Sequence, residues 1–244
     1  MIAAPVLLLS VWIANDAIEG GAEQQVCDVS ADYFLGVEDY SKAIRLHIEV
    51  IREHPTNALA HYHLGFAEGM VGDRTAEVRE YQRAEALGHR SWDLFLNLGL
   101  AQLESADLDA ATESLRRAVF LGGDHCESHY NLALVDVERG MLADAEHQTL
   151  ATLRLNAQQP DARNLLGFIY AQEGKTASAS EVWRDLVRDV PDYEPARENL
   201  AILGSPTEAA NGETAAVNLP QTAAVHAILD EREVHLTSGE VPSQ

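Results

Sequence analysis

Aromatic residues and positive charges are both scarce in this chain of 244 residues. Only 6% of the residues are Phe, Trp or Tyr, and 17 Lys and Arg stand against 39 Asp and Glu, for a net charge of −22. A surface this acidic repels phosphate backbones and weakens adhesion to anionic lipid headgroups, which argues against nucleic-acid binding. Hydrophobic residues still make up 46%. Ala, Leu and Glu are abundant and lose little side-chain freedom in helices, so the composition favours a helical fold.

Motifs that carry catalysis or bind cofactors are missing as well. The two cysteines, Cys27 and Cys126, form no CxxC pair and no zinc-binding spacing. The sequence contains no GxSxG elbow, phosphate-binding loop or dinucleotide fingerprint. The stretch HCESH at residues 125–129 places candidate ligands on one turn, but it is not HExxH and no further ligand accompanies it. We therefore predict a protein that is not an enzyme and holds no metal and no cofactor.

The N-terminal run at residues 2–14 is apolar or small and free of charge. It is shorter than the roughly 20 residues of a transmembrane helix and fits the hydrophobic region of a secretory signal, with residues 20–22 as a small-residue cleavage site. No Lys or Arg precedes it, so the end of a longer membrane helix and a helix buried at the domain edge are alternatives. We expect residues 1–22 to be a signal peptide or membrane anchor. The protein is then periplasmic, secreted or membrane-anchored, and it is cytoplasmic if the run is not a signal.

A period of 34 residues runs through most of the chain. A small residue follows Leu at five positions in this register: Leu64-Gly65, Leu98-Gly99, Leu132-Ala133, Leu166-Gly167 and Leu200-Ala201. Three further columns keep the same step, a small one, a bulky one and a turn column: Ala43, Glu77, Ala111, Ala145 and Ala179; His47, Tyr81, Leu115, Thr149 and Trp183; Glu38, Gly72, Ala106, Gly140 and Gly174. Columns that stay in phase without an insertion indicate tandem structural repeats.

Each repeat is predicted to contain two helices. Residues 92–106 space their apolar side chains along one helix face, and a second amphipathic stretch follows at residues 108–123. Small residues such as Gly65 and Ala111 let the paired helices approach closely, because the distance between helix axes depends on the side chains at the contact.

The period and its columns resemble the tetratricopeptide repeat (TPR) family. The resemblance covers about residues 23–204 and rests on the Leu-Gly pairs, the small columns, Tyr170, and the unit-ending Pro55 and Pro191. It implies an all-α fold, a right-handed α-solenoid of about five helix-turn-helix units with a C-terminal capping helix at residues 193–203. The sequence departs from the family pattern at Glu77, which fills an Ala position, and in the polar first helix of the first unit.

The tail at residues 205–244 has a different composition. Its first part, residues 205–221, contains Pro, Gly, Asn and Thr without a helical stripe, which predicts a largely disordered acidic tail. Residues 222–234 have a spacing compatible with one short amphipathic helix.

Several histidines fall in repeat columns. His61 and His129 share a column with Phe95, which indicates a packing role rather than a ligand role. His63 shares its column with Asn97, which indicates a polar, hydrogen-bonding role rather than metal binding.

The resemblance also implies a binding site, because the first helices of TPR units line a concave groove. In this sequence the groove residues are Tyr62, Phe66, Leu96, Leu100, Leu103, Tyr130, Leu134, Val137, Asn164 and Phe168. None of them is Lys or Arg, which argues against the carboxylate clamp that some family members use for chaperone C-termini. An apolar stripe suits an apolar peptide or an amphipathic helix. Alternatively, these side chains pack between neighbouring units.

Two functions remain open from the sequence. The first is a non-catalytic scaffold or adaptor whose groove binds a protein or peptide segment, basic or amphipathic because the groove rim is acidic. The second is a membrane-tethered or exported structural module whose groove is occupied in cis by its own segment at residues 222–234.

Overall fold

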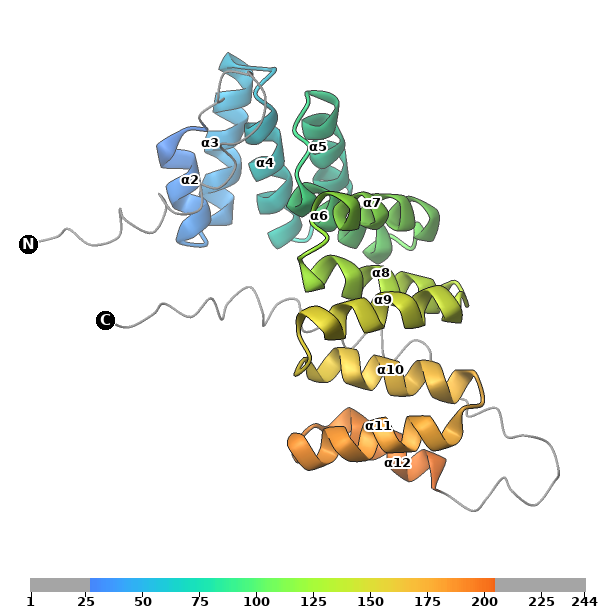
Figure 1. Cartoon of the computed structure of the whole chain (residues 1–244). Helices are drawn as coiled ribbons and strands as arrows, with labels where there is room; N and C mark the ends of the chain where they lie inside the picture. The colour runs from blue at the N-terminus through green and yellow to red at the C-terminus, as the bar shows by residue number, and fades with distance from the viewer. Residues whose placement is uncertain (1–26, 205–244) are drawn as a thin grey trace, which may run out of the picture. The chain divides into compact units, whose positions relative to one another are not determined.

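The computed structural model describes residues 27–204, which form helices without a strand (Figure 1). The predicted signal or anchor at residues 1–22 and the predicted tail at residues 205–244, with its segment 222–234, lie outside the described residues. None of the helices between residues 27 and 204 is long and apolar enough to cross a membrane.

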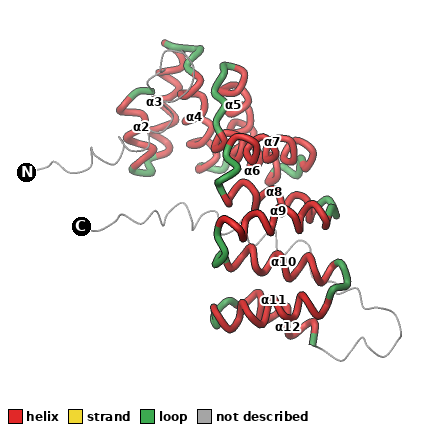
Figure 2. The backbone as a smooth tube through the Cα atoms, in the orientation of Figure 1, coloured by secondary structure: helices red, strands yellow, loops and turns green. Residues whose placement is uncertain are grey.

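The chain divides into two compact units, the first ending at Ser105 and the second beginning at Ala106. The first unit contains α2 (Val29–Gly36), α3 (Tyr40–Glu53), α4 (Ala58–Met70), α5 (Arg74–Ala86) and α6 (Trp92–Glu104). The second unit contains α7 (Leu108–Leu121), α8 (Cys126–Glu138), α9 (Leu142–Leu155), α10 (Pro160–Gln172), α11 (Thr176–Asp189) and α12 (Glu194–Leu203). Within each unit, helices that follow one another in the chain pack against one another, and short loops join them (Figure 2).

This order confirms the predicted all-α solenoid. In chain order, each repeat supplies a first and a second helix, from α2 and α3 to α10 and α11, and α12 follows as the predicted final helix. The first residues of α4, α6, α8 and α10 are spaced by 34 residues, so these helices occupy equivalent positions in successive repeats. The polar start of the first repeat forms only the short helix α2, which buries just Ala31 and Asp32.

The turn column has one backbone conformation throughout. Its five members all have positive φ values: Glu38 at 60°, Gly72 at 85°, Ala106 at 59°, Gly140 at 71° and Gly174 at 74°. This left-handed conformation ends the first helix of each repeat, and glycine adopts it without steric cost. In the first three repeats an Asp follows at the next position and caps the second helix: Asp39, Asp73 and Asp107 each accept a backbone N–H three residues on.

The small columns set the close contact between paired helices. The backbone of Gly65 on α4 lies against the ring of Tyr81 on α5, and Gly167 on α10 lies in the same way against Trp183 on α11. Both aromatic side chains are fully buried. In these two repeats the first helix therefore packs closely on the second, because the aromatic ring fills the space that a side chain at the glycine position would take.

Candidate functional site

In the first unit, the predicted groove residues differ in how far they are exposed. Tyr62 on α4 is only 4% exposed, and its ring packs against the rings of Tyr81 and His89, with ring centroids 5.7 Å and 5.1 Å away. Its hydroxyl donates to Asp93 Oδ2 at 2.9 Å and accepts from Asn97 Nδ2 at 3.1 Å. Tyr62 therefore joins α4 to α6.

Three other groove residues of this unit are half-buried: Phe66 on α4, and Leu96 and Leu100 on α6. Phe66 packs edge-on against Tyr40, with ring centroids 6.5 Å apart. Leu96 and Leu100 are four residues apart and so share one face of α6. Leu103, the last predicted residue of the unit, is buried.

In the second unit, the predicted groove residues belong mostly to the hydrophobic core. Tyr130, Leu134 and Val137 on α8 and Phe168 on α10 are all part of one buried cluster. Asn164 on α10 is half-buried and its Oδ1 accepts a hydrogen bond from Asn199 Nδ2 at 3.0 Å. The structure thus separates the predicted set into buried residues that hold helices together and four half-buried residues: Phe66, Leu96, Leu100 and Asn164.

Two histidines, His61 and His129, share the repeat column of Phe95. Each forms a hydrogen bond that links the two helices of its repeat. His61 Nδ1 donates to Glu80 Oε2 at 2.7 Å, and His129 Nδ1 donates to Gln148 Oε1 at 2.7 Å. Both bonds join a first helix to the second helix nineteen residues on.

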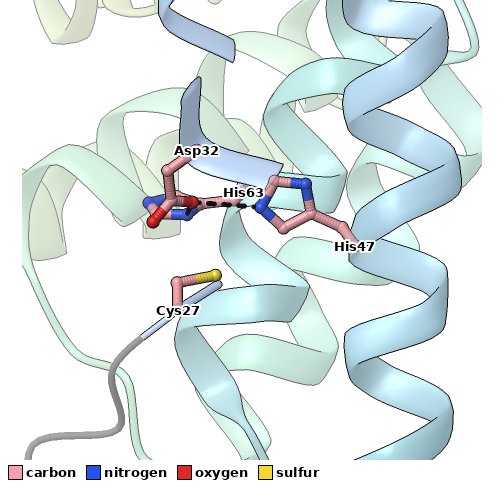
Figure 3. A group of neighbouring side chains, drawn as sticks. All are labelled: Cys27, Asp32, His47 and His63. Carbon is pink, nitrogen blue, oxygen red and sulfur yellow. Dashed lines mark hydrogen bonds and ion pairs between the residues drawn. The ribbon is translucent and has the colours of Figure 1, made fainter. Parts of the chain in front are cut away.

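A cluster of potential ligands that the sequence did not predict lies at the start of the first unit. Cys27 precedes α2, Asp32 lies on α2, His47 on α3 and His63 on α4, and their donor atoms all lie within 4.8 Å of one another. Figure 3 shows the Asp32 carboxylate facing the His47 ring and overlapping the His63 ring in this view, with the Cys27 thiol nearby. We call these four residues the Cys-Asp-His-His cluster.

Asp32 is the centre of the hydrogen bonds in this cluster. Its Oδ1 lies 2.7 Å from His63 Nδ1 and 3.2 Å from His47 Nε2. On the far side of its ring, His47 Nδ1 donates to the backbone carbonyl of Ala43 at 2.8 Å. Since a carbonyl only accepts, this bond fixes the tautomer and directs Nε2 of His47 at the carboxylate.

The pKa values of the two acids in the cluster shift in opposite directions. Burial alone raises the pKa of Asp32, but the hydrogen bonds from His47 and His63 outweigh this effect and hold the pKa well below its usual range. Burial, reinforced by the charge of Asp32, raises the pKa of the Cys27 thiol far above its usual value. The carboxyl is therefore ionised, and the thiol keeps its proton unless a metal ion binds beside it.

A signal for this cluster was present in the sequence. His47 occupies the bulky column, whose other members are Tyr81, Leu115, Thr149 and Trp183. The other residues of this column are buried, and a buried titratable side chain needs a hydrogen-bonding or charged partner nearby. That partner, Asp32, lies in the first helix of the first repeat, where the repeat pattern is weakest.

No protein-family model and no curated protein sequence matches this chain. Among solved structures, the chain is similar to YrrB, described as "a TPR protein with an unusual peptide-binding site". The two are 20% identical, with a TM-score of 0.67, over 81% of this chain and 98% of that one. It is also similar to a crystal structure of MamA, at 21% identity and a TM-score of 0.63, over 72% of this chain and 98% of that one. A MamA structure from Desulfovibrio magneticus RS-1 gives 16% identity and a TM-score of 0.63, over 67% and 93%. At these identities, the likeness concerns the fold.

Proposed function

We propose that this chain, which has the tetratricopeptide repeat fold, is a non-catalytic scaffold that binds a segment of another protein along the first helices of its repeats. One of the proteins that share the fold is described as having a peptide-binding site, which supports this role. A solenoid of this kind presents equivalent positions at regular intervals, which suits an extended or helical segment.

The observation that carries the proposal is the position of Phe66 and Leu100. They occupy the same place in successive repeats, on α4 and α6, and both keep part of their apolar surface in contact with solvent. Leu96 adds a third apolar side chain one turn before Leu100. Half-buried apolar side chains in a row bind a partner without ordering new backbone, since the helices beneath them are already packed.

We infer that the buried members of the predicted set act differently. Tyr62, Tyr130 and Phe168 hold the helices in place and contribute to binding only by keeping the half-buried residues in position. Asn164 supplies a polar contact in the second unit, because its amide is half-buried.

The proposed partner is a basic or amphipathic segment. The net charge of −22 attracts a basic segment and raises its association rate at low ionic strength. Export or membrane attachment through residues 1–22 remains part of the proposal, and it implies a partner in the same compartment.

Site-specific crosslinking tests the proposal. A photoreactive phenylalanine analogue is placed at Phe66 and, as a matched control, at Phe120 on the second helix α7, which is 87% exposed. We expect a segment of one partner to crosslink at position 66 and not at position 120. A synthetic peptide of that segment then binds the unmodified chain, and Phe66→Ser weakens the binding by at least about tenfold. Equal crosslinking at both positions, or unchanged peptide binding by a folded Phe66→Ser variant, would refute the proposal that the partner binds in the groove.

The same assay decides between a partner in trans and occupancy in cis. If residues 222–234 occupy the groove, the analogue at position 66 crosslinks within the chain, and removal of residues 205–244 increases capture of the peptide. If the groove is open, the truncation leaves peptide binding unchanged.

A further inference from the structure

We propose that Cys27, Asp32, His47 and His63 bind a divalent transition metal ion of the Zn²⁺ class, which joins the segment before α2 to the first three helices. This inference goes beyond the scaffold function and does not depend on it. It rests on the donor set, the geometry, the orientation of His47 and the balance of buried charge.

The donor set consists of ligand types that Zn²⁺ binds in proteins. One thiol, one carboxylate and two imidazoles supply sulfur, oxygen and nitrogen, each of which is a regular zinc ligand. Four protein ligands complete a tetrahedron and leave no open position for a substrate. The proposed ion is therefore structural rather than catalytic.

The distances suit a tetrahedral ion after small side-chain adjustments. Metal–ligand bonds of about 2.0–2.3 Å place neighbouring ligand atoms about 3.3–3.8 Å apart. The four donor atoms already lie within 4.8 Å of one another, and Asp32 Oδ1 lies 2.7 Å from His63 Nδ1 and 3.2 Å from His47 Nε2. Movements of about 1 Å or less bring all of these separations to the tetrahedral value.

The orientation of His47 favours a cation at this point. Because its Nδ1 donates to the Ala43 carbonyl, its Nε2 faces Asp32 Oδ1 with a lone pair unless it carries a second proton. A lone pair and a carboxylate oxygen 3.2 Å apart repel each other, so a proton or a metal ion must lie between them. A backbone carbonyl on the outer nitrogen is also the arrangement by which proteins orient metal-binding imidazoles.

The charges of the proposed site cancel. Zn²⁺ carries two positive charges, and a Cys27 thiolate with an Asp32 carboxylate carries two negative ones, while the imidazoles stay neutral. Cys27 is 4% exposed and His47 is fully buried, so an unbalanced charge here would be costly. The side chain of His63, 15% exposed, marks the side from which an ion enters.

A metal-free hydrogen-bond network is the alternative. It accounts for Asp32 and His63, but it requires a proton in the fully buried gap between His47 Nε2 and Asp32 Oδ1 and gives the Cys27 thiol no role beyond a weak hydrogen bond. The proposed ion uses all four residues. It also stabilises an end repeat whose helix α2 buries only Ala31 and Asp32 and so contributes little to the hydrophobic core.

Metal titration of the full chain tests the site. After treatment with a chelator, we expect the protein to take up one equivalent of Zn²⁺ against a competing indicator dye, with an increase in the midpoint of thermal unfolding. Co²⁺ in its place should give the d–d bands of a tetrahedral ion and a thiolate-to-cobalt charge-transfer band. Uptake of less than a tenth of an equivalent would overturn the proposal.

Matched variants separate this site from other thiols and histidines. Cys27→Ser should abolish the charge-transfer band, and His63→Gln should weaken Zn²⁺ binding by at least about 100-fold. The controls Cys126→Ser and His129→Gln, outside the cluster, should leave both unchanged. His63 is only half-buried, so its variant is expected to fold, which circular dichroism checks. Binding that survives in the folded His63→Gln variant, or that is lost in Cys126→Ser, contradicts the assignment.

Discussion

The indole ring of Trp183 on α11 occupies the space beside Gly167 on α10 that a side chain at position 167 would need. A methyl group on Gly167 would lie 2.6 Å from Cε2 of the indole. The ring is held there by its Nε1, which donates to the backbone carbonyl of Asn164 at 3.2 Å. One repeat earlier, the same two positions are Ala133 and Thr149. A larger residue in the small column is therefore accompanied by a smaller residue in the bulky column, and the reverse.

Gly167→Ala is expected to lower the free energy of unfolding by about 1–3 kcal/mol, because overpacking against Trp183 outweighs the gain in helix propensity of about 1 kcal/mol. Urea unfolding measures the change. Trp183→Thr recreates the pair of the preceding repeat and removes the clash, so in that background Gly167→Ala should become neutral or stabilising. An equal cost in both backgrounds would contradict the steric explanation.

Ala106→Gly is expected to raise the free energy of unfolding by about 0.5–1 kcal/mol. Ala106 has a φ of 59°, and the relief of its Cβ strain exceeds the added entropy of the unfolded chain. The reciprocal change, Gly72→Ala, imposes the strain at the equivalent turn and should destabilise by at least as much. Thermal unfolding of both variants beside the wild type checks the signs, and a loss of stability in Ala106→Gly would count against the argument.

Glu68→Gln should stabilise the protein at neutral pH but not in acid. Burial, with the charge of nearby Glu80, raises the pKa of Glu68 from 4.5 to about 7. The folded state thus binds a proton that the unfolded state releases above pH 4.5, and the wild type loses stability as the pH rises from about 4.5 to 7. The amide carries no charge, so the advantage of the variant should grow across this window to about 1–3 kcal/mol and then stay constant.

The measurement for Glu68 is chemical unfolding at a series of pH values, with the exposed Glu49→Gln as control. Asp136→Asn provides a second case in the other unit. Burial, with the charge of Asp144, raises the pKa of Asp136 from 3.8 to about 6. The stability advantage of Asp136→Asn over the wild type should therefore develop as the pH rises from about 3.8 to about 6. An advantage of Glu68→Gln that is equal at pH 4 and pH 8 would exclude the carboxylate as its cause.

Tyr62→Phe should cost about 1–2 kcal/mol of stability and leave partner binding unchanged. The variant keeps the ring but removes the hydroxyl that Asp93 and Asn97 share. Tyr33→Phe, at an exposed position, is the matched control and should be neutral. Peptide binding measured on the same samples distinguishes a residue that holds helices from one that contacts the partner, since only the latter would change affinity.

The repeat pattern predicted the fold because it recurs in every unit. The turn column coincides with five of the six positive φ values among residues 27–204, and the small column coincides with close helix contacts, as at Gly65. Each repeat needs the same turn and the same close helix contact, so the residues that allow them recur at a fixed period in the sequence. The final helix was also predicted, within one residue of its observed start at Glu194.

The site was less predictable because it depends on contacts that do not recur. Repeat position gives Tyr62 and Phe66 the same predicted role, but the His89 ring and Asp93 cover only Tyr62. The Cys-Asp-His-His cluster combines one residue from a loop with three from different columns. Its centre, Asp32, lies in the repeat that departs most from the pattern.

The packing of helices against their neighbours in sequence also bears on how the chain folds. Within each unit, the helices that pack closely on one another are consecutive or one helix apart, so these contacts do not require the closure of a long loop. The entropy lost before the first favourable contacts form is therefore small, as in other proteins of low contact order. The packed helix pairs inside each unit can nucleate separately and extend to their neighbours. A metal ion at one end would supply such a nucleus, joining three helices before the aliphatic layers beyond them have formed.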